Sequence, residues 1–345
     1  MDLRYAVVDI RRCVRLDDVV VGLDLHLKNI QGTIMKMSGE IVKQEKFRTR
    51  KENLQEFLDG VPVGSKVALE SLGFCWPWID YLEELGYKPL LANPVKVKSR
   101  AEDVQTDKVD SELLAHLTRM DWLPTSYVPS SELRWLRNFM RHRAFRVKMS
   151  TALKNRSRSE FRKRDISLSA DLGTRKGRVL AASLGVFEVV ENIELLEVIE
   201  KQTYEMERMF RKRYGKLKSV QLLMTIPGVG LLTALTLYAE ICDIRRFPNP
   251  EKLAHYCGLV PRVHQSADHT RLGKEAKGDR WLKCVLVEAA WCHIRFCPGG
   301  RLAKVFGDAC KRKRDKRKAI KIVARKLVNV VWAVWTDERE FMVME

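Results

Sequence analysis

Five short β-prone runs, separated by amphipathic stretches, fill residues 19–91 and constrain the fold of this chain more than any other feature. The first three, VVVGLDL (19–25), IQGTIMK (30–36) and GEIVKQEKF (39–47), predict an antiparallel meander with a turn at Ser38-Gly39. KVALE (66–70) predicts a buried fourth strand, and residues 87–91 a fifth. Helices are expected at 52–58, 76–85 and 106–120, the second ending at Gly86.

The order of these elements, three strands and then strand–helix–strand–helix, is that of an α/β RNase H-like domain. Such a domain carries acidic residues at its strand ends and on a following helix. Pro124 and Pro129 close the unit. We therefore expect a first domain at about residues 1–125.

Two long helices are expected next. Apolar residues recur at steps of three and four through 133–151, and a second series follows through 189–210. Such spacing is typical of coiled-coil helices, either as an antiparallel hairpin within the chain or between chains. The sequence thus predicts a basic helical linker at about residues 126–218.

A mostly α-helical domain is expected from residue 219 to 345. Its segment TIPGVGLLTALTLYAEI contains Pro227-Gly228-Val229-Gly230 between two helical stretches, a helix-hairpin-helix-like pattern whose turn offers backbone N–H groups to a phosphate. Another helix starts at Pro248–Pro250, residues 258–278 are interpreted as a polar loop, and helices are expected at 281–295 and 316–335.

The net charge of +19 is concentrated in two places. Residues 132–178 hold 15 basic and 4 acidic residues, and residues 301–326 hold 12 basic and 2 acidic, so the rest of the chain is nearly neutral. Concentrated positive charge indicates a polyanionic partner, nucleic acid first and an acidic membrane surface a distant second.

A membrane span and secretion are not expected. The longest apolar run, near residues 231–242, is shorter than the roughly 20 residues of a span. The first ten residues lack the apolar core of a signal peptide. The eight cysteines form no CxxC pair and are expected to be reduced thiols in a cytoplasmic protein.

Four carboxylates stand at positions suited to metal binding. Asp24 lies within the first strand, Glu70 ends the fourth, and Asp107 and Asp110 lie three apart at a helix start, about 5–6 Å apart at Cβ. Clustered carboxylates favour Mg²⁺ or Mn²⁺, which neutralises their repulsion. Alternatively, Asp107 is only a helix-terminal charge and Glu70 a solvated strand end. Asp9 is a rival for the first-strand position, but only Asp24 is followed by the meander.

The chain also resembles a known family. VVGLDLHLKN, KVALESLGF, LLANPVKVKS, QTDKVDSELLAHL, TIPGVGLLTALTLYAEI, FPNPEKLAHYCGLVPRVHQS and WLKCVLVEAAWCHIR together look like the DEDD serine transposases of bacterial insertion sequences. That family includes the pilin-gene invertases and the recombinases guided by a bridge RNA. The resemblance spans residues 19–335 and implies that Asp24, Glu70, Asp107 and Asp110 form the acidic tetrad of a RuvC-like domain.

The resemblance further implies that Ser266 is the nucleophile and forms a covalent phosphoserine link to DNA. Arg262, His264 and Lys274 flank its loop and are candidates for holding the phosphate; the alternative is that they are only solvated charges. Two departures stand near the predicted site. The family usually has Gly after this serine, where the chain has Ala267-Asp268. The family also commonly has Lys two residues after the first Asp or directly after the His, whereas here Leu27 intervenes before Lys28.

By the same resemblance, the subunits pair through the linker and assemble as dimers of dimers, each active site joining one subunit's tetrad to another subunit's Ser266. The partners are double-stranded DNA and a noncoding guide RNA in a bacterial, nucleoid-associated setting. Two other functions stay open. One is a RuvC-like metal-dependent junction nuclease that uses water as its nucleophile, and the other is a non-catalytic nucleic-acid-binding relic.

Overall fold

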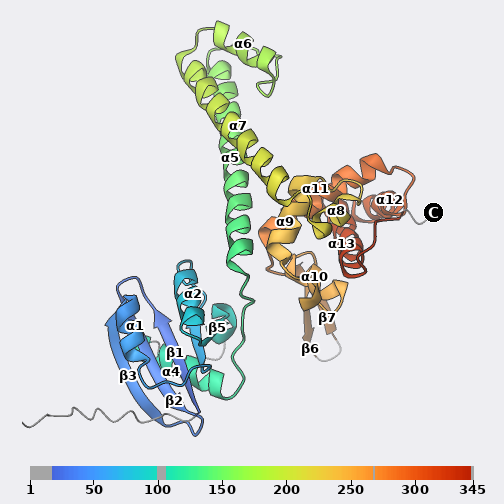
Figure 1. Cartoon of the computed structure of the whole chain (residues 1–345). Helices are drawn as coiled ribbons and strands as arrows, with labels where there is room; N and C mark the ends of the chain where they lie inside the picture. The colour runs from blue at the N-terminus through green and yellow to red at the C-terminus, as the bar shows by residue number, and fades with distance from the viewer. Residues whose placement is uncertain (1–17, 99–105, 267–268, 343–345) are drawn as a thin grey trace, which may run out of the picture. The chain divides into compact units, whose positions relative to one another are not determined.

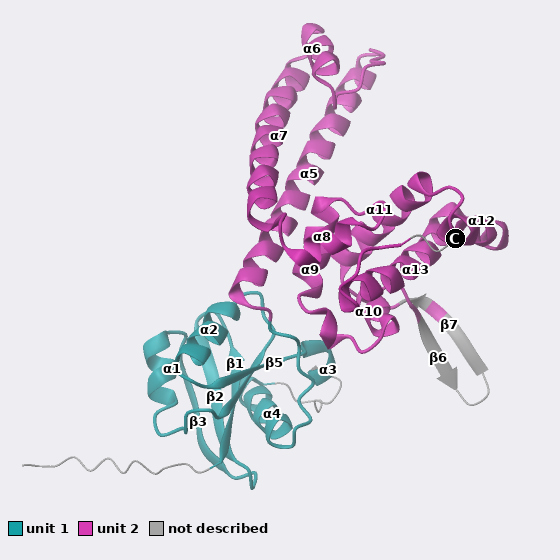
Figure 2. Cartoon of the chain, turned by 45° about the vertical axis from the view of Figure 1, so that its right-hand side comes forward, with its two compact units in different colours: residues 1–128 teal, residues 129–345 magenta. Residues whose placement is uncertain are grey.

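The computed structural model describes residues 18–98, 106–266 and 269–342. The chain divides into two compact units, residues 1–128 and 129–345 (Figure 2). The finer division at residues 125 and 218 stays a prediction. Asp9 lies outside the described residues, whereas Asp24 lies in a strand.

The first unit is a mixed α/β fold (Figure 1). Its strands are β1 (Val19–Leu25), β2 (Asn29–Lys36), β3 (Ile41–Arg48), β4 (Lys66–Glu70) and β5 (Lys88–Ala92), and its helices are α1 (Lys51–Phe57), α2 (Trp76–Glu84), α3 (Pro94–Lys98) and α4 (Asp107–Arg119). The strand order is β3-β2-β1-β4-β5. The meander is antiparallel, whereas β4 and β5 run parallel to β1. The expected strands and helices are confirmed; α3 was not predicted.

Strand β1 is buried along its whole length because helices cover both faces of the sheet. Val21 and Leu23 belong to a core that also contains residues of α1 and α2. The alternate residues face α4, where Val20 packs with Ala115. At Gly22 the helix comes so close that a β-carbon would lie 2.1 Å from the Ser111 carbonyl oxygen. Glycine at this position therefore sets how closely α4 approaches the sheet.

The second unit is mostly helical. Its helices are α5 (Ser131–Lys163), α6 (Arg175–Ser183), α7 (Phe187–Tyr214), α8 (Lys218–Met224), α9 (Leu231–Ile241), the short 3₁₀ helix η1 (Ile244–Arg246), α10 (Pro250–Tyr256), α11 (Arg280–Phe296), α12 (Arg301–Lys313) and α13 (Lys316–Thr336). None of the helices in the described ranges is long and apolar enough to cross a membrane. The cysteines of these ranges are free thiols, as expected.

The interpretation of residues 258–278 as a loop is wrong. The segment contains an antiparallel pair of strands, β6 (Pro261–Ser266) and β7 (His269–Glu275), with Val263 opposite Leu272. The sequence signal was weak because polar residues occupy both faces of each strand. The pair forms a two-stranded sheet of its own, without a larger sheet to join.

Helices α5 and α7 lie side by side as a hairpin within the chain (Figures 1 and 2). At one end, Arg213 pairs with Glu132 at 3.3 Å. At the other, Arg164 pairs with Glu188 at 3.0 Å. The two helices are therefore antiparallel, and of the two arrangements left open by the sequence the structure shows the intramolecular one. We call this hairpin with α6 the arm.

The base of the arm is built into the core of the second unit. Leu136 of α5 and Phe210 of α7 belong to the same apolar cluster as Leu235 and Leu327. Beside this cluster, Arg141 forms a two-bond pair with the buried carboxylate of Glu240, at 2.8 and 2.9 Å. Arg137 reaches the same carboxylate at 2.9 Å. We call these three residues the Glu240 cluster.

Candidate metal centre

Two of the predicted acidic residues stand at the carboxyl ends of neighbouring parallel strands. Asp24 is the penultimate residue of β1, and Glu70 is the last residue of β4. The strands are in register at Leu23 and Leu69, so the next residue of each lies side by side on the α4 face. Asp24 and Glu70 line one cavity of about 460 Å³, with His26 among its other walls.

The other two acidic residues lie in the first turn of α4. The helix begins there because the Thr106 hydroxyl accepts a hydrogen bond from the Val109 N–H at 3.3 Å. Since α4 packs closely over Gly22, this turn lies near the end of β1. The Asp107 and Asp110 carboxylates both raise the pKa of Asp24, so they lie within electrostatic range of it.

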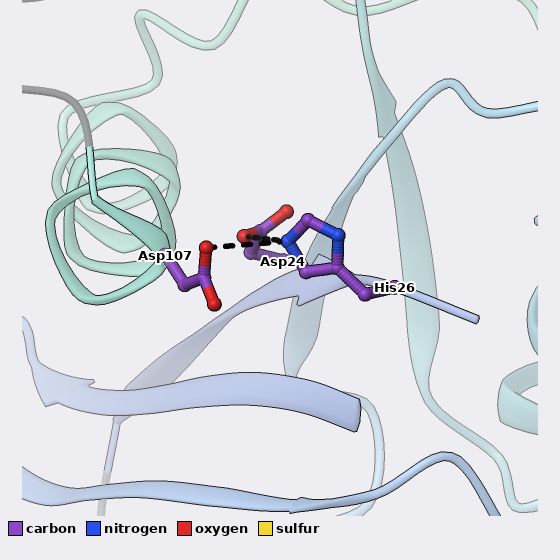
Figure 3. A group of neighbouring side chains, drawn as sticks. All are labelled: Asp24, His26 and Asp107. Carbon is purple, nitrogen blue, oxygen red and sulfur yellow. Dashed lines mark hydrogen bonds and ion pairs between the residues drawn. The ribbon is translucent and has the colours of Figure 1, made fainter. Parts of the chain in front are cut away.

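His26 lies between two of these carboxylates and was missed by the sequence analysis (Figure 3). Its Nε2 atom is 3.0 Å from Asp24 Oδ2 and 3.4 Å from Asp107 Oδ1. Ligand atoms of these three residues all lie within 4.8 Å of one another. The available signal was the two-residue spacing from Asp24, which places both side chains on the same side of an extended segment.

The charges of this cluster are only partly compensated. Burial raises the pKa of the Asp24 carboxyl, the His26 contact lowers it, and the Asp107 and Asp110 carboxylates raise it further. In contrast, the hydrogen bond from Lys46 lowers the pKa of Asp107, with Lys46 Nζ 2.7 Å from Asp107 Oδ2. Asp107 is therefore more than a helix-terminal charge, because it also contacts side chains from two other segments. A buried carboxylate beside other acidic groups fits a hard divalent cation.

The predicted nucleophile is in the second unit. Ser266 is the last residue of β6 and pairs with His269, the first residue of β7. Ala267 and Asp268, the departure from the family pattern, lie outside the described residues. The catalytic role of Ser266 and the phosphate-holding roles of Arg262, His264 and Lys274 stay predictions.

Two family models match this chain. A model of DEDD-type IS110 transposases matches residues 21–163, which include Asp24, Glu70, Asp107 and Asp110. A second, described as "Transposase IS116/IS110/IS902 family", matches residues 220–304, which include Ser266.

Similar proteins extend over nearly the whole chain. A probable family 20 transposase of Pseudomonas aeruginosa is 24% identical over 92% of this chain and 97% of its own length. The transposase for insertion sequence element IS1111A of Coxiella burnetii is 23% identical over 98% and 95%. A pilin gene-inverting protein of Moraxella bovis is 31% identical over 35% of this chain and 38% of its own.

With its mixed sheet and carboxylate cluster, the chain falls in the class of DNA transposases and recombinases. Within that class its sequence is similar to the transposases of IS110/IS116 type, whose models match residues 21–163 and 220–304. A transposase acts on DNA, and the DEDD type implies a divalent metal ion. The cluster around Asp24 offers the oxygen ligands that such an ion requires.

Proposed function

We propose that this protein is the recombinase of an insertion sequence and that it cuts and rejoins DNA through a covalent bond to Ser266. In this proposal the first unit is a RuvC-like domain. Asp24, Glu70, Asp107 and Asp110 hold Mg²⁺, or Mn²⁺ in its place. The observation that carries the proposal is the gathering of acidic side chains where β1 and β4 end beside the first turn of α4.

The first-unit residues supply the negative charge that binds the metal. The hydrogen bond from Lys46 lowers the pKa of Asp107 and so favours its charged form. Burial disfavours the charged form of Asp24 and a bound cation would favour it, so metal binding and the charge of Asp24 are coupled. His26 is an additional ligand candidate. When bound, a divalent ion polarises a phosphate and stabilises the charge that develops on its oxygens.

The reaction is an exchange of phosphodiester bonds. A bond forms between Ser266 Oγ and a DNA phosphorus as the bond from phosphorus to one deoxyribose oxygen breaks. The serine gives up a proton, and the leaving oxygen takes one up. The reverse step on the hydroxyl of another strand rejoins the DNA. No water is consumed, which separates this reaction from a nuclease reaction.

The assembly is part of the same proposal. Subunits associate as dimers and dimers of dimers, with the tetrad of one subunit acting together with Ser266 of another. A noncoding RNA selects the donor and target DNA. The basic segments support this, since α5 and α6 carry one of them and α12 and α13 the other, and phosphate contacts dominate the recognition of structured RNA.

The decisive experiment is a test for a covalent adduct. The purified protein and any RNA bound to it are incubated with labelled DNA carrying an element end and with Mg²⁺, and the products are separated on a denaturing gel. Wild-type protein is expected to give a labelled protein–DNA band. Ser266→Ala should give none, whereas Thr270→Ala, which removes a hydroxyl from the neighbouring strand, should retain it.

The variants also separate the alternative functions. Strand cleavage that persists in Ser266→Ala without an adduct would indicate a junction nuclease with water as its nucleophile. Glu70→Gln and Asp107→Asn should abolish both adduct and cleavage, with Glu52→Gln, an exposed residue of α1 in the same unit, as the control. Unchanged recombination in Glu70→Gln and Asp107→Asn would indicate a non-catalytic role for the tetrad.

A further inference from the structure

A groove of about 780 Å³ lies in the second unit, beside the turn that joins α8 to α9. One wall is α7, with Tyr204, Arg208 and Arg211; the other is the turn 227–230 and the start of α9, and Phe296 of α11 also lines it. We call it the α7–α9 groove. None of its lining residues belongs to the proposed catalytic set.

The turn is held in one conformation by α11. Gly228 has φ +90°, and a β-carbon there would lie 2.6 Å from the Ala289 carbonyl oxygen. The buried His293 contributes a hydrogen bond between its Nδ1 and the Pro227 carbonyl oxygen, at 2.8 Å. Backbone groups of the turn are thus fixed in direction before any ligand arrives, which lowers the entropic cost of binding.

Gly230 is different, because nothing in the described part of the chain requires a glycine there. Its φ is −84°, which any residue adopts, and a β-carbon would meet no atom within 4 Å. Gly230 is exposed and precedes α9, and no side chain caps the N–H groups of that helix. A missing side chain at this position leaves the backbone open to close approach by another molecule.

The α7 wall presents positive charge that the protein does not neutralise. Arg208 and Arg211 are both exposed and line the groove, and neither forms an ion pair within the described part of the chain. The nearby Glu207 is engaged, since its Oε1 lies 2.8 Å from Arg143 Nε. The free charge of this wall is therefore that of the two arginines, which favours an anionic occupant.

Aromatic rings at the groove indicate which anion. Tyr204 is 68% exposed and Phe296 is 73% exposed, far more than apolar rings in a folded core. Exposed rings beside arginines provide stacking surfaces for unpaired bases together with contacts for phosphates, the combination found in proteins that bind single strands. In a duplex the bases are already stacked on one another, so these rings would have no comparable role.

We propose that the α7–α9 groove binds single-stranded DNA. Its phosphates contact Arg208, Arg211 and the N–H groups that follow Gly230, and its bases stack on Tyr204 and Phe296. A strand opened during exchange would supply such a segment. The inference uses the proposed function only for the identity of the nucleic acid, and it does not depend on Ser266.

The test measures binding of a fluorescent oligodeoxythymidine 12-mer to the full-length protein by anisotropy, as a function of salt. The double variant Arg208→Ala/Arg211→Ala should bind at least tenfold more weakly. Its slope of log affinity against log salt should be shallower by about 1.4, since each lost single-strand phosphate contact removes about 0.7. Lys201→Ala/Lys212→Ala, with both residues on the same helix but outside the groove, is the charge-matched control.

A second pair of variants tests the glycine. Gly230→Ala should weaken binding severalfold with an unchanged melting temperature, whereas Gly299→Ala should not, although a β-carbon there also meets nothing within 4 Å. Wild-type affinity in both Arg208→Ala/Arg211→Ala and Gly230→Ala would overturn the proposal. Three other results would also overturn it. The variants could lose as much affinity for duplex DNA as for the 12-mer, or lose affinity only for oligouridine RNA. Alternatively, polyglutamate could compete with the labelled 12-mer as strongly as the unlabelled oligonucleotide does.

The outcome is distinguishable from failure of the catalytic proposal. If Ser266→Ala abolishes the covalent adduct while the groove variants bind the 12-mer normally, the recombinase proposal stands and the groove proposal falls. If the groove variants lose binding and no adduct forms in the wild type, the groove proposal stands and the recombinase proposal falls.

Discussion

Gly22 of β1 lies directly against the backbone of Ser111 in α4, so that a β-carbon on Gly22 would stand 2.1 Å from the Ser111 carbonyl oxygen. The same β-carbon would lie 2.7 Å from the Ala115 nitrogen. Because both atoms belong to a helix backbone, neither can turn away. This contact fixes α4, and with it Asp107 and Asp110, at the end of the strand that carries Asp24.

Gly22→Ala is therefore expected to push α4 away from the sheet. We expect a destabilisation of about 1–3 kcal/mol, the usual cost of overpacking. We also expect weaker Mn²⁺ binding, because Asp24 and Asp107 move apart. Urea denaturation and calorimetric titration with Mn²⁺ measure the two effects. Gly73→Ala is the control, since a β-carbon there meets no atom within 4 Å; equal behaviour of the two variants would contradict this account of α4.

Asp24→Asn should stabilise the metal-free protein while abolishing metal binding. Burial raises the pKa of Asp24 in the folded state, so the charged form is disfavoured and its destabilising effect grows as pH rises through that pKa. The variant should match wild type below the ordinary pKa of 3.8 and exceed it by about 1 kcal/mol at neutral pH. Denaturation in EDTA across this pH range checks it; a pH-independent difference would count against the electrostatic cause.

His26→Ala should weaken Mn²⁺ binding by about tenfold if His26 is a ligand or orients one. The reason is its position, with Nε2 within 3.4 Å of oxygens from both Asp24 and Asp107. Calorimetric titration of the full chain gives the affinity. If His26 were instead only a counter-charge to the carboxylates, its removal would raise the affinity for Mn²⁺. The sign of the change in Mn²⁺ affinity therefore distinguishes a ligand or orienting role from a counter-charge role.

Arg141→Ala should destabilise the second unit by about 3 kcal/mol, because it removes one of the two arginines that compensate the buried Glu240 carboxylate and leaves Arg137 alone. The Glu240 side chain is 1% exposed. Arg143→Ala is the matched control on the same helix, since its partner Glu207 is about one-third exposed and such a pair contributes at most about 1 kcal/mol. Urea denaturation of both variants tests the difference, which should vanish if burial of Glu240 has no energetic role.

Much of the first unit could be predicted because its strands carry their own signals. β1 is an apolar run interrupted by Asp24, and an acidic residue in such a position is rarely there for packing. The nearness of α4 could also be expected from topology. His26 was harder to predict, because its two-residue spacing from Asp24 was the available signal and its second partner, Asp107, is far away in sequence.

The second unit was harder to predict for two physical reasons. Apolar periodicity shows that α5 and α7 have a partner face, but it does not identify the partner, so the intramolecular hairpin had to come from pairs such as Arg213 with Glu132. The strands β6 and β7 lack an apolar alternation, since they form a small sheet of polar residues. Ser266 was selected by resemblance alone, and the β6–β7 strand pair gives its backbone position without testing its role.

The arm and the α7–α9 groove share one helix, α7. From Phe187 near the tip to Arg208 in the α7–α9 groove, α7 is one uninterrupted helix, and this distance is about 31 Å at about 1.5 Å per residue. Its companion α5 is anchored at the base by the Glu240 cluster. A single rigid element therefore joins the tip of the arm to the wall where Arg208 and Arg211 stand, and a displacement of the helix axis at one end is also a displacement of the groove wall at the other.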